Sequence, residues 1–248
     1  MTYRPKIGIT MRLEILSRRF YLGRDYSEAL VGAGASPVHI PLIPDKSYLA
    51  DVVAGLDGIL LPGSDTDVDP ARFGEQPHRE LGTVIDEKDQ TDLYVLEEAE
   101  RLGLPVFAIC YGMQVLNVFR GGTLVQDIGS QISGAIKHQQ GFPLERRSHS
   151  IEIERDSLLE KALGVVHNTI NVNSHHHQAI AKIGNDLKAT AFATDGVVEA
   201  IEDSRSGRFT FGVQWHPELD WRADALSLAL FGEFVKAARG RITAISGG

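Results

Sequence analysis

The sequence contains a single cysteine among 248 residues, so no disulfide can form within the chain. A chain without disulfides is typical of a reducing compartment. No run of apolar residues approaches the ~18 that a membrane span requires. The first residues, MTYRPKIGIT, also lack the apolar stretch of a signal peptide. We therefore expect a cytoplasmic protein that has no contact with a membrane.

Positive charge is scarce as well, with 25 lysines and arginines against 33 acidic residues and a net charge of −8 at pH 7. Domains that bind nucleic acid usually carry a basic face. The sequence has no basic cluster with interleaved aromatic residues, so we expect no nucleic-acid partner. Nothing in the residues decides between a monomer and a homodimer.

The N-terminal half alternates short apolar runs with helical patterns. Continuous apolar runs predict strands buried on both faces, and their alternation with helices predicts a parallel sheet between two helical layers. The expected strands are residues 6–11, 36–42, 58–63 and 105–110, and the expected helices are 25–34, 47–54, 88–102 and 111–119.

The C-terminal half has a different texture. Residues 149–154, HSIEIE, alternate polar and apolar side chains, as a half-exposed antiparallel strand does. Further strands are expected at 169–173, 187–194, 197–201 and 209–214, with a last helix at 223–238. No linker or repeat separates the halves, so we predict one α/β domain over residues 1–248 with a mostly parallel sheet and antiparallel C-terminal strands. Two long loops, 64–86 and 129–147, are candidate walls of a pocket.

Cys110 lies between a buried strand and a helix in the segment AICYGMQ. A nucleophile on such a tight turn is exposed at the carboxyl edge of the sheet. The amides and partial positive charge of the helix N-terminus favour a thiolate. Gly112 lets the turn stay tight. Taken alone, Cys110 could equally be a small buried hydrophobic residue.

A second motif, FGVQWHPE, ends on His216 and Glu218. An imidazole has a pKa suited to accepting a thiol proton and returning it to a leaving amine. A carboxylate two residues further on can hold the other ring nitrogen. Taken alone, this pair could be a structural histidine beside a solvated glutamate.

The segment LPGSDTD places Gly63 at the end of a third strand. Its backbone amide and that of Tyr111 could form a two-donor oxyanion hole, although Pro-Gly after a strand is usually only a turn.

Together these motifs resemble the class I glutamine amidotransferases, and within them the γ-glutamyl hydrolases of the peptidase C26 group. The similarity runs through LPGSDTDVDPARFGE, PVFAICYGMQVLNVFRGGTLVQDI, VNSHHHQAI and FGVQWHPE in that order. The chain looks closest to γ-glutamyl-γ-aminobutyrate hydrolases of putrescine breakdown, because of VDPARFGE and VNSHHHQ.

The resemblance implies a flavodoxin-like three-layer fold and a cysteine hydrolase that needs no cofactor. It implies a triad of Cys110, His216 and Glu218, with the oxyanion hole at the amides of Gly63 and Tyr111. It also implies that a small γ-glutamyl substrate contacts three further residues, Gln114, Ser174 and His176.

The chain departs from the family pattern at three positions. Tyr111 replaces a small residue or arginine, Thr91 replaces an arginine before Asp92, and His177 replaces a glycine. These changes leave the triad intact and leave open which amine the enzyme releases.

The three consecutive histidines, His175, His176 and His177, could suggest a metal. Neighbours on a strand point to opposite faces, so all three cannot bind one ion, and no acidic or cysteine cluster at ligand spacing accompanies them. We therefore expect that these histidines bind no metal and that one of them, with His176 favoured, lines the pocket.

The acidic run Asp65, Asp67 and Asp69 could suggest a cation-binding loop. It lacks the glycine and distal glutamate of a calcium loop and is expected to be solvated or to gate the substrate.

Three other functions share these motifs. A glutaminase subunit that passes ammonia to a synthetase partner would have the same triad, but this chain carries no synthetase domain. Hydrolysis of folate γ-glutamyl tails usually needs a secretory or vacuolar route, for which no targeting segment is present. A non-catalytic binding protein could keep the fold without activity.

Overall fold

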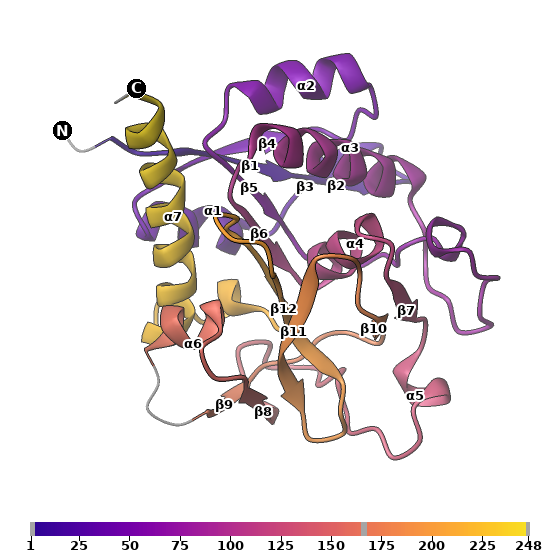
Figure 1. The fold of residues 1–248 in the computed structure, drawn as a ribbon. Coiled ribbons are helices and arrows are strands. Elements are labelled where there is room, and N and C mark those ends of the chain that lie inside the picture. The colour runs from indigo at the N-terminus through magenta and orange to yellow at the C-terminus, as the bar shows by residue number, and fades with distance from the viewer. Residues whose placement is uncertain (1–2, 165–167, 247–248) are drawn as a thin grey trace.

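The computed structural model describes residues 3–164 and 168–246, and its central element is a mixed sheet of nine strands. The strand order is β4-β1-β5-β6-β13-β12-β11-β8-β9 (Figure 1). In chain order the strands are β1 (Lys6–Thr10), β4 (Ser36–Ile40), β5 (Gly58–Leu61), β6 (Val106–Ile109), β8 (His149–Ile153), β9 (Thr169–Val172), β11 (Leu187–Ala193), β12 (Val198–Asp203) and β13 (Thr210–Val213).

The sheet is parallel from β4 to β13 and antiparallel over the remaining four strands, β12, β11, β8 and β9. The inner parallel strands β5, β6 and β13 are buried at every position, because helices cover both faces. Strand β9, at the antiparallel edge, has exposed positions instead. The predicted fold class, a mostly parallel sheet with antiparallel C-terminal strands, is confirmed.

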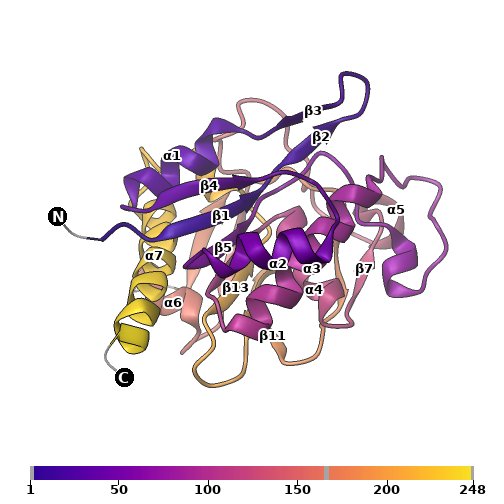
Figure 2. The same ribbon diagram turned by 90° about the horizontal axis from the view of Figure 1, so that it is seen from above.

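The pleat of the parallel strands divides the core into two layers, since successive side chains point to opposite faces. In β6, Phe107 and Ile109 join one cluster of buried residues, whereas Val106 and Ala108 join the other. Helices α1 (Arg24–Gly32) and α7 (Ala225–Ser246) cover the first face, and α2 (Lys46–Ala54), α3 (Asp86–Leu102) and α4 (Tyr111–Phe119) cover the second. Figure 2 shows α2 and α3 side by side. The sheet therefore lies between two helical layers, as predicted.

The structure also contains short elements that the sequence patterns did not predict. They are the hairpin of β2 (Arg12–Glu14) and β3 (Arg19–Tyr21), the pair of β7 (Thr123–Val125) and β10 (Ala179–Lys182), helices α5 (Ile128–Gln131) and α6 (Leu158–Leu163), and the 3-10 turns η1 (Pro70–Phe73) and η2 (Pro217–Leu219). Elements this short offer too few positions for a periodicity to show.

Helix α7 runs to Ser246, past its expected end at 238. Gly240 lies inside it, which a helix tolerates at a cost of about 1 kcal/mol relative to alanine. Neither α7 nor another helix in the described ranges combines the length and apolar character needed to cross a membrane.

Gly112 fixes how closely α4 approaches β5. A Cβ atom at this position would lie 2.3 Å from the backbone oxygen of Leu61, which cannot move without shifting the strand. We expect Gly112→Ala to lower the free energy of unfolding by about 1–3 kcal/mol, the usual cost of overpacking. Urea denaturation would measure the loss.

Gly232 provides the matched control, because it also lies in a helix, α7, but no atom of the described residues would lie within 4 Å of its Cβ. Gly232→Ala should raise the free energy of unfolding, by up to about 1 kcal/mol from helix propensity. Equal effects of the two substitutions would contradict the packing argument.

Candidate functional site

Cys110 occupies a strained turn between β6 and α4. Its backbone has φ 52° and ψ −110°, and a positive φ is uncommon for a residue with a side chain. The amide of Cys110 donates to the carbonyl of Val213 in β13 (2.8 Å), and its carbonyl accepts from Gln114 (3.1 Å). These bonds hold the thiol-bearing residue at the carboxyl edge of the sheet, where the sequence predicted it.

His216 follows β13, the strand that pairs in parallel with β6. Because Val213 lies beside Ile109, the chain leaves both strands at the same edge of the sheet. His216 Nδ1 contacts Glu218 Oε1 at 2.7 Å, and both side chains are buried. The geometry therefore joins an imidazole to the carboxylate that the sequence assigned to it.

The thiol and the imidazole lie together. Burial by itself lowers the pKa of His216, but the charges of Glu218 and Cys110 and the hydrogen bond with Glu218 outweigh it and raise the pKa to about 10. Among the described residues, no hydrogen-bond partner of His216 Nε2 meets the usual distance and angle limits. The surroundings of His216 therefore favour the binding of a proton by the imidazole.

Asn173 fixes the backbone of His216 from both sides, a role that the sequence analysis missed. Its Oδ1 accepts from the His216 amide, and its Nδ2 donates to the His216 carbonyl, each at 2.8 Å. Asn173 precedes the VNSHHHQ histidines by one serine, but only the fold brings it beside a residue 43 positions away. A single sequence carries no signal of such a pairing.

Gly63 lies against the same pair of side chains. A Cβ at this position would lie 2.8 Å from His216 Cε1 and 3.5 Å from Cys110 Cβ, so only glycine fits. The sequence analysis assigned the Gly63 amide to an oxyanion hole. In the structure this amide already has an acceptor, because it donates to the buried hydroxyl of Tyr26 at 3.0 Å. Tyr111 is the first residue of α4, where an amide has no acceptor within the helix.

A cavity of about 170 Å³ opens at Cys110 and Gln114. Both long loops contribute to its walls, as predicted, together with the histidine segment. The lining residues are Ser64, Asp65, Thr66, Asp67, Gly82, Cys110, Tyr111, Gln114, Gln139, His175, His176, His177 and Gln178. The lining is predominantly polar in residue type and includes two carboxylates, Asp65 and Asp67.

The histidine segment meets the cavity in a different way from that expected. All three of His175, His176 and His177 line it, whereas Ser174 does not. The Ser174 hydroxyl donates to the His138 carbonyl at 2.5 Å and so holds the segment from behind. His176 Nδ1 forms a hydrogen bond with the carbonyl of Gln178 at 2.9 Å, and its Nε2 lies 3.6 Å from Glu199 Oε1. Both ring nitrogens of His176 therefore lie next to protein atoms.

His177 forms part of the cavity wall by pairing with an aspartate from the first long loop. Its Nε2 lies 2.8 Å from Asp67 Oδ1, and this hydrogen bond raises the pKa of His177 against the opposing effect of burial. Asp67 also accepts from the Gly82 amide at 2.6 Å. The acidic run is therefore neither fully solvated nor arranged for calcium, since Asp67 ties two walls of the cavity together.

Tyr111, one of the three departures from the family pattern, lines the cavity, but its hydroxyl is turned to α3. The phenol is buried, and its hydroxyl donates to Asp89 of α3. Burial raises the pKa of Asp89 to about 6, although the hydrogen bond from Tyr111 opposes this. Tyr111 thus anchors the start of α4, and with it Cys110, to the neighbouring helix.

The comparisons with known proteins agree with this fold. Residues 6–218 match the peptidase C26 family, and the chain belongs to that family. It is 36% identical to the protein NtpR of Enterococcus hirae over 217 residues, which cover 87% of this chain and 89% of the relative. It is 33% identical over 249 residues to γ-glutamyl-γ-aminobutyrate hydrolase PuuD of Escherichia coli, covering 96% and 95% of the two chains.

Among solved structures, a protein of Thermoplasma acidophilum described as a GMP synthase subunit superimposes with a TM-score of 0.68. The superposition covers 99% of this chain and 100% of that protein at 17% identity, which shows a shared fold. The family and its γ-glutamyl hydrolase relatives support a hydrolase, while other relatives, such as one in Rickettsia prowazekii, are described as glutamine amidotransferase-like.

Glu218 makes the largest favourable contribution to the raised pKa of His216. We therefore expect Glu218→Gln to make the His216 ring lose its proton at a lower pH than in the unaltered protein. An NMR titration of the histidine ring carbons, assigned with His216→Gln, would measure both values. Glu233→Gln on the exposed side of α7 is the control, and an unchanged His216 titration in Glu218→Gln would contradict the assignment.

Proposed function

We propose that this protein hydrolyses the γ-glutamyl amide bond of a small γ-glutamyl compound, with Cys110 as nucleophile, His216 as base and Glu218 as the residue that orients the imidazole. The observation that carries the proposal is the positive-φ turn of Cys110 beside the His216–Glu218 pair at a polar cavity. A nucleophile, a base and an orienting carboxylate in this order are what acyl transfer requires.

The reaction proceeds in two steps. The Cys110 sulfur, whose proton His216 takes up, attacks the δ-carbonyl of the γ-glutamyl group. His216 then gives that proton to the leaving nitrogen, the C–N bond breaks, and a γ-glutamyl thioester remains on Cys110. Water that loses a proton to His216 attacks the thioester, and glutamate leaves as the sulfur regains its proton. Covalent catalysis replaces one difficult hydrolysis by two easier steps.

The amides of Tyr111 and Gly63 are the proposed donors to the oxyanion. An oxyanion accepts hydrogen bonds more strongly than a neutral phenol does. The developing charge would therefore take over the Gly63 amide from Tyr26, whose hydroxyl accepts from it in the substrate-free arrangement. Until the substrate binds, the Tyr26 hydroxyl thus accepts the hydrogen bond of the buried Gly63 amide.

The cavity supports a small substrate. Its volume of about 170 Å³ accommodates a glutamyl group. We propose that Gln114 and the segment around His176 bind this group, and that Ser174 positions the segment. The carboxylates of Asp65 and Asp67 suit the α-ammonium of glutamate. γ-Glutamyl-γ-aminobutyrate, a compound of putrescine breakdown, is the proposed substrate because of the similarity to PuuD.

A glutaminase that supplies ammonia to a synthetase partner is the second candidate, favoured by the fold shared with the GMP synthase subunit of Thermoplasma acidophilum. The isolated protein should be assayed for glutamate released from glutamine, γ-glutamyl-γ-aminobutyrate and γ-glutamylputrescine. A hydrolase works unaided on the substituted amides. Activity confined to glutamine, and weak without a partner, would favour the glutaminase.

Cys110→Ala should reduce hydrolysis of the best substrate in that panel to background, because the chain has no other cysteine to form the thioester. Circular dichroism of the variant should match that of the unaltered protein. Turnover retained by the variant would refute the nucleophile assignment. A thiol-reactive γ-glutamyl analogue that fails to label Cys110 in the unaltered protein would instead favour a non-catalytic binding protein.

His216→Ala should lower kcat more than Glu218→Gln does. Without the imidazole the proposed base is lost, whereas without the carboxylate the imidazole still acts from a poorer orientation. Steady-state kinetics on one γ-glutamyl amide would rank the two variants. The reverse ranking would mean that Glu218 does more than orient His216.

A further inference from the structure

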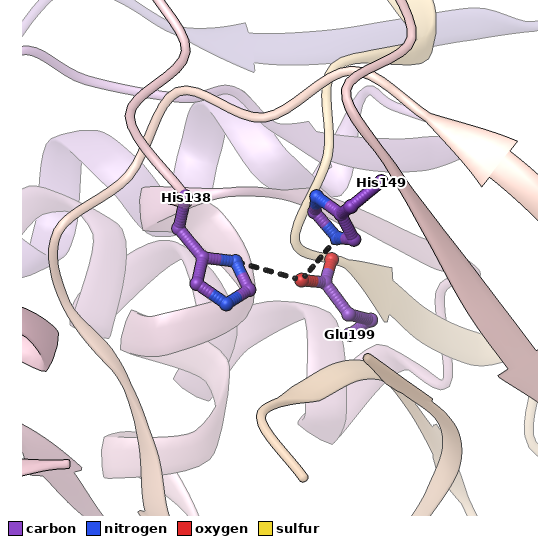
Figure 3. Close-up of side chains that lie close together, drawn as sticks. All are labelled: His138, His149 and Glu199. Carbon is purple, nitrogen blue, oxygen red and sulfur yellow. Dashed lines mark hydrogen bonds and ion pairs between the residues drawn. The ribbon is translucent and has the colours of Figure 1, made fainter. Parts of the chain in front are cut away.

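Three histidines surround the carboxylate of Glu199 in the C-terminal half of the chain. His149 Nε2 lies 3.1 Å, His138 Nδ1 3.3 Å and His176 Nε2 3.6 Å from Glu199 Oε1. Figure 3 shows His138 and His149 on either side of this carboxylate. None of the four side chains is more than 6% exposed. Four segments that are distant in the sequence therefore meet at one buried oxygen.

The outer nitrogens of two of these rings are committed as donors. His138 Nε2 lies 2.9 Å from the Asp195 carboxylate, and His176 Nδ1 lies 2.9 Å from the Gln178 carbonyl. A carbonyl or an ionised carboxylate can only accept, so each of these nitrogens carries a hydrogen. In the neutral rings, His138 Nδ1 and His176 Nε2 therefore present bare lone pairs.

Those lone pairs face the oxygen of Glu199, which is an acceptor as well. Among the described residues, neither inner nitrogen makes a hydrogen bond with acceptable geometry, and Glu199 Oε2 has no partner either. Buried polar atoms are normally satisfied, and leaving one unsatisfied costs about 1–3 kcal/mol. Two bare lone pairs and a carboxylate therefore converge on one point, where His149 Nε2 also lies, 3.1 Å from Glu199 Oε1.

We propose that His138, His149 and Glu199 bind a divalent transition-metal ion, with zinc as the best match. The ligand atoms of these three buried side chains all lie within 4.8 Å of one another. Neutral imidazole and carboxylate are zinc ligands at about 2.0–2.2 Å, which separates tetrahedral ligand atoms by about 3.4 Å. The separations of His149 Nε2 (3.1 Å) and His138 Nδ1 (3.3 Å) from Glu199 Oε1 lie close to that value. Asp195 supplies the outer hydrogen bond that orients a metal-binding histidine.

The site offers three protein ligands, and His176 Nε2 lies next to them, 3.6 Å from Glu199 Oε1. It joins β8 and β12 to the loop of His138, whose carbonyl accepts from Ser174 at the start of the histidine segment that lines the cavity beside Cys110. A neighbouring cavity of about 380 Å³, lined in part by His138 and His176, offers the ion a path from solvent. The metal would therefore fix one wall of the candidate active site from behind, without taking part in the reaction.

Zinc binding should be tested in the full chain carrying Cys110→Ala, because a free thiol beside His216 would itself bind zinc. This background makes the readout independent of hydrolysis, so the metal site and the proposed function can fail separately. We expect one zinc ion per chain by elemental analysis and by competition with a chelator. Cobalt in its place should give the visible absorption of a tetrahedral ion. At zinc concentrations near 100 times Kd, the equilibrium constant for unfolding should fall about 100-fold.

Adding His149→Gln should weaken zinc binding by at least about 100-fold, and adding Asp195→Asn by about 10–100-fold. The matched control is His177→Gln, because His177 lies between two carboxylates but outside this cluster. The proposal is overturned if the folded Cys110→Ala protein binds no zinc at micromolar free concentrations, as expected if the inner nitrogens carry protons. It is also overturned if His149→Gln binds zinc as tightly as its parent.

Discussion

The parallel pairing of β6 with β13 is the constraint on which the site depends. It brings the ends of both strands to one edge of the sheet, so that Cys110 and His216 emerge side by side although 106 residues (216 − 110) separate them in the sequence. The hydrogen bond from the Cys110 amide to Val213 couples the two ends directly. The positive φ of Cys110 is maintained because the strand before it and the helix after it are both buried.

Satisfied polar groups surround this edge and give the reactive pair its charge state. Asn173 holds the backbone of His216, Glu218 holds its ring, and Tyr26 occupies the Gly63 amide. Each partner is buried, where a hydrogen bond or an ion pair acts in a low dielectric and is correspondingly strong. The pKa of His216 is raised for this reason. The cluster around Glu199 differs because the inner nitrogens of His138 and His176 lack such partners among the described residues.

The predicted elements of the sheet and of the main helices match the structure because each has a strong local signal. The fully apolar runs of β5 and β6 and the long periodic stretch of α3 illustrate this. The histidine segment was harder to interpret, since His175, His176 and His177 were considered as neighbours in sequence. In the structure they turn to three different partners, namely Leu144, Glu199 and Asp67. The sequence analysis argued against a metal because neighbours on a strand point to opposite faces and no acidic or cysteine cluster at ligand spacing accompanies these histidines. Two of the proposed ligands, His138 and Glu199, lie far away along the chain.

The sequence alone determined the family, the strand-turn-helix around Cys110 and the carboxylate that accompanies His216, because these depend on residues close together in the chain. Only the tertiary structure decided that Tyr111 turns to Asp89, that Ser174 lies behind the cavity wall and that three histidines meet at Glu199. Such contacts depend on the order and register of the strands. Side chains tens of residues apart acquire neighbours only when the sheet forms, and no local pattern encodes those distances.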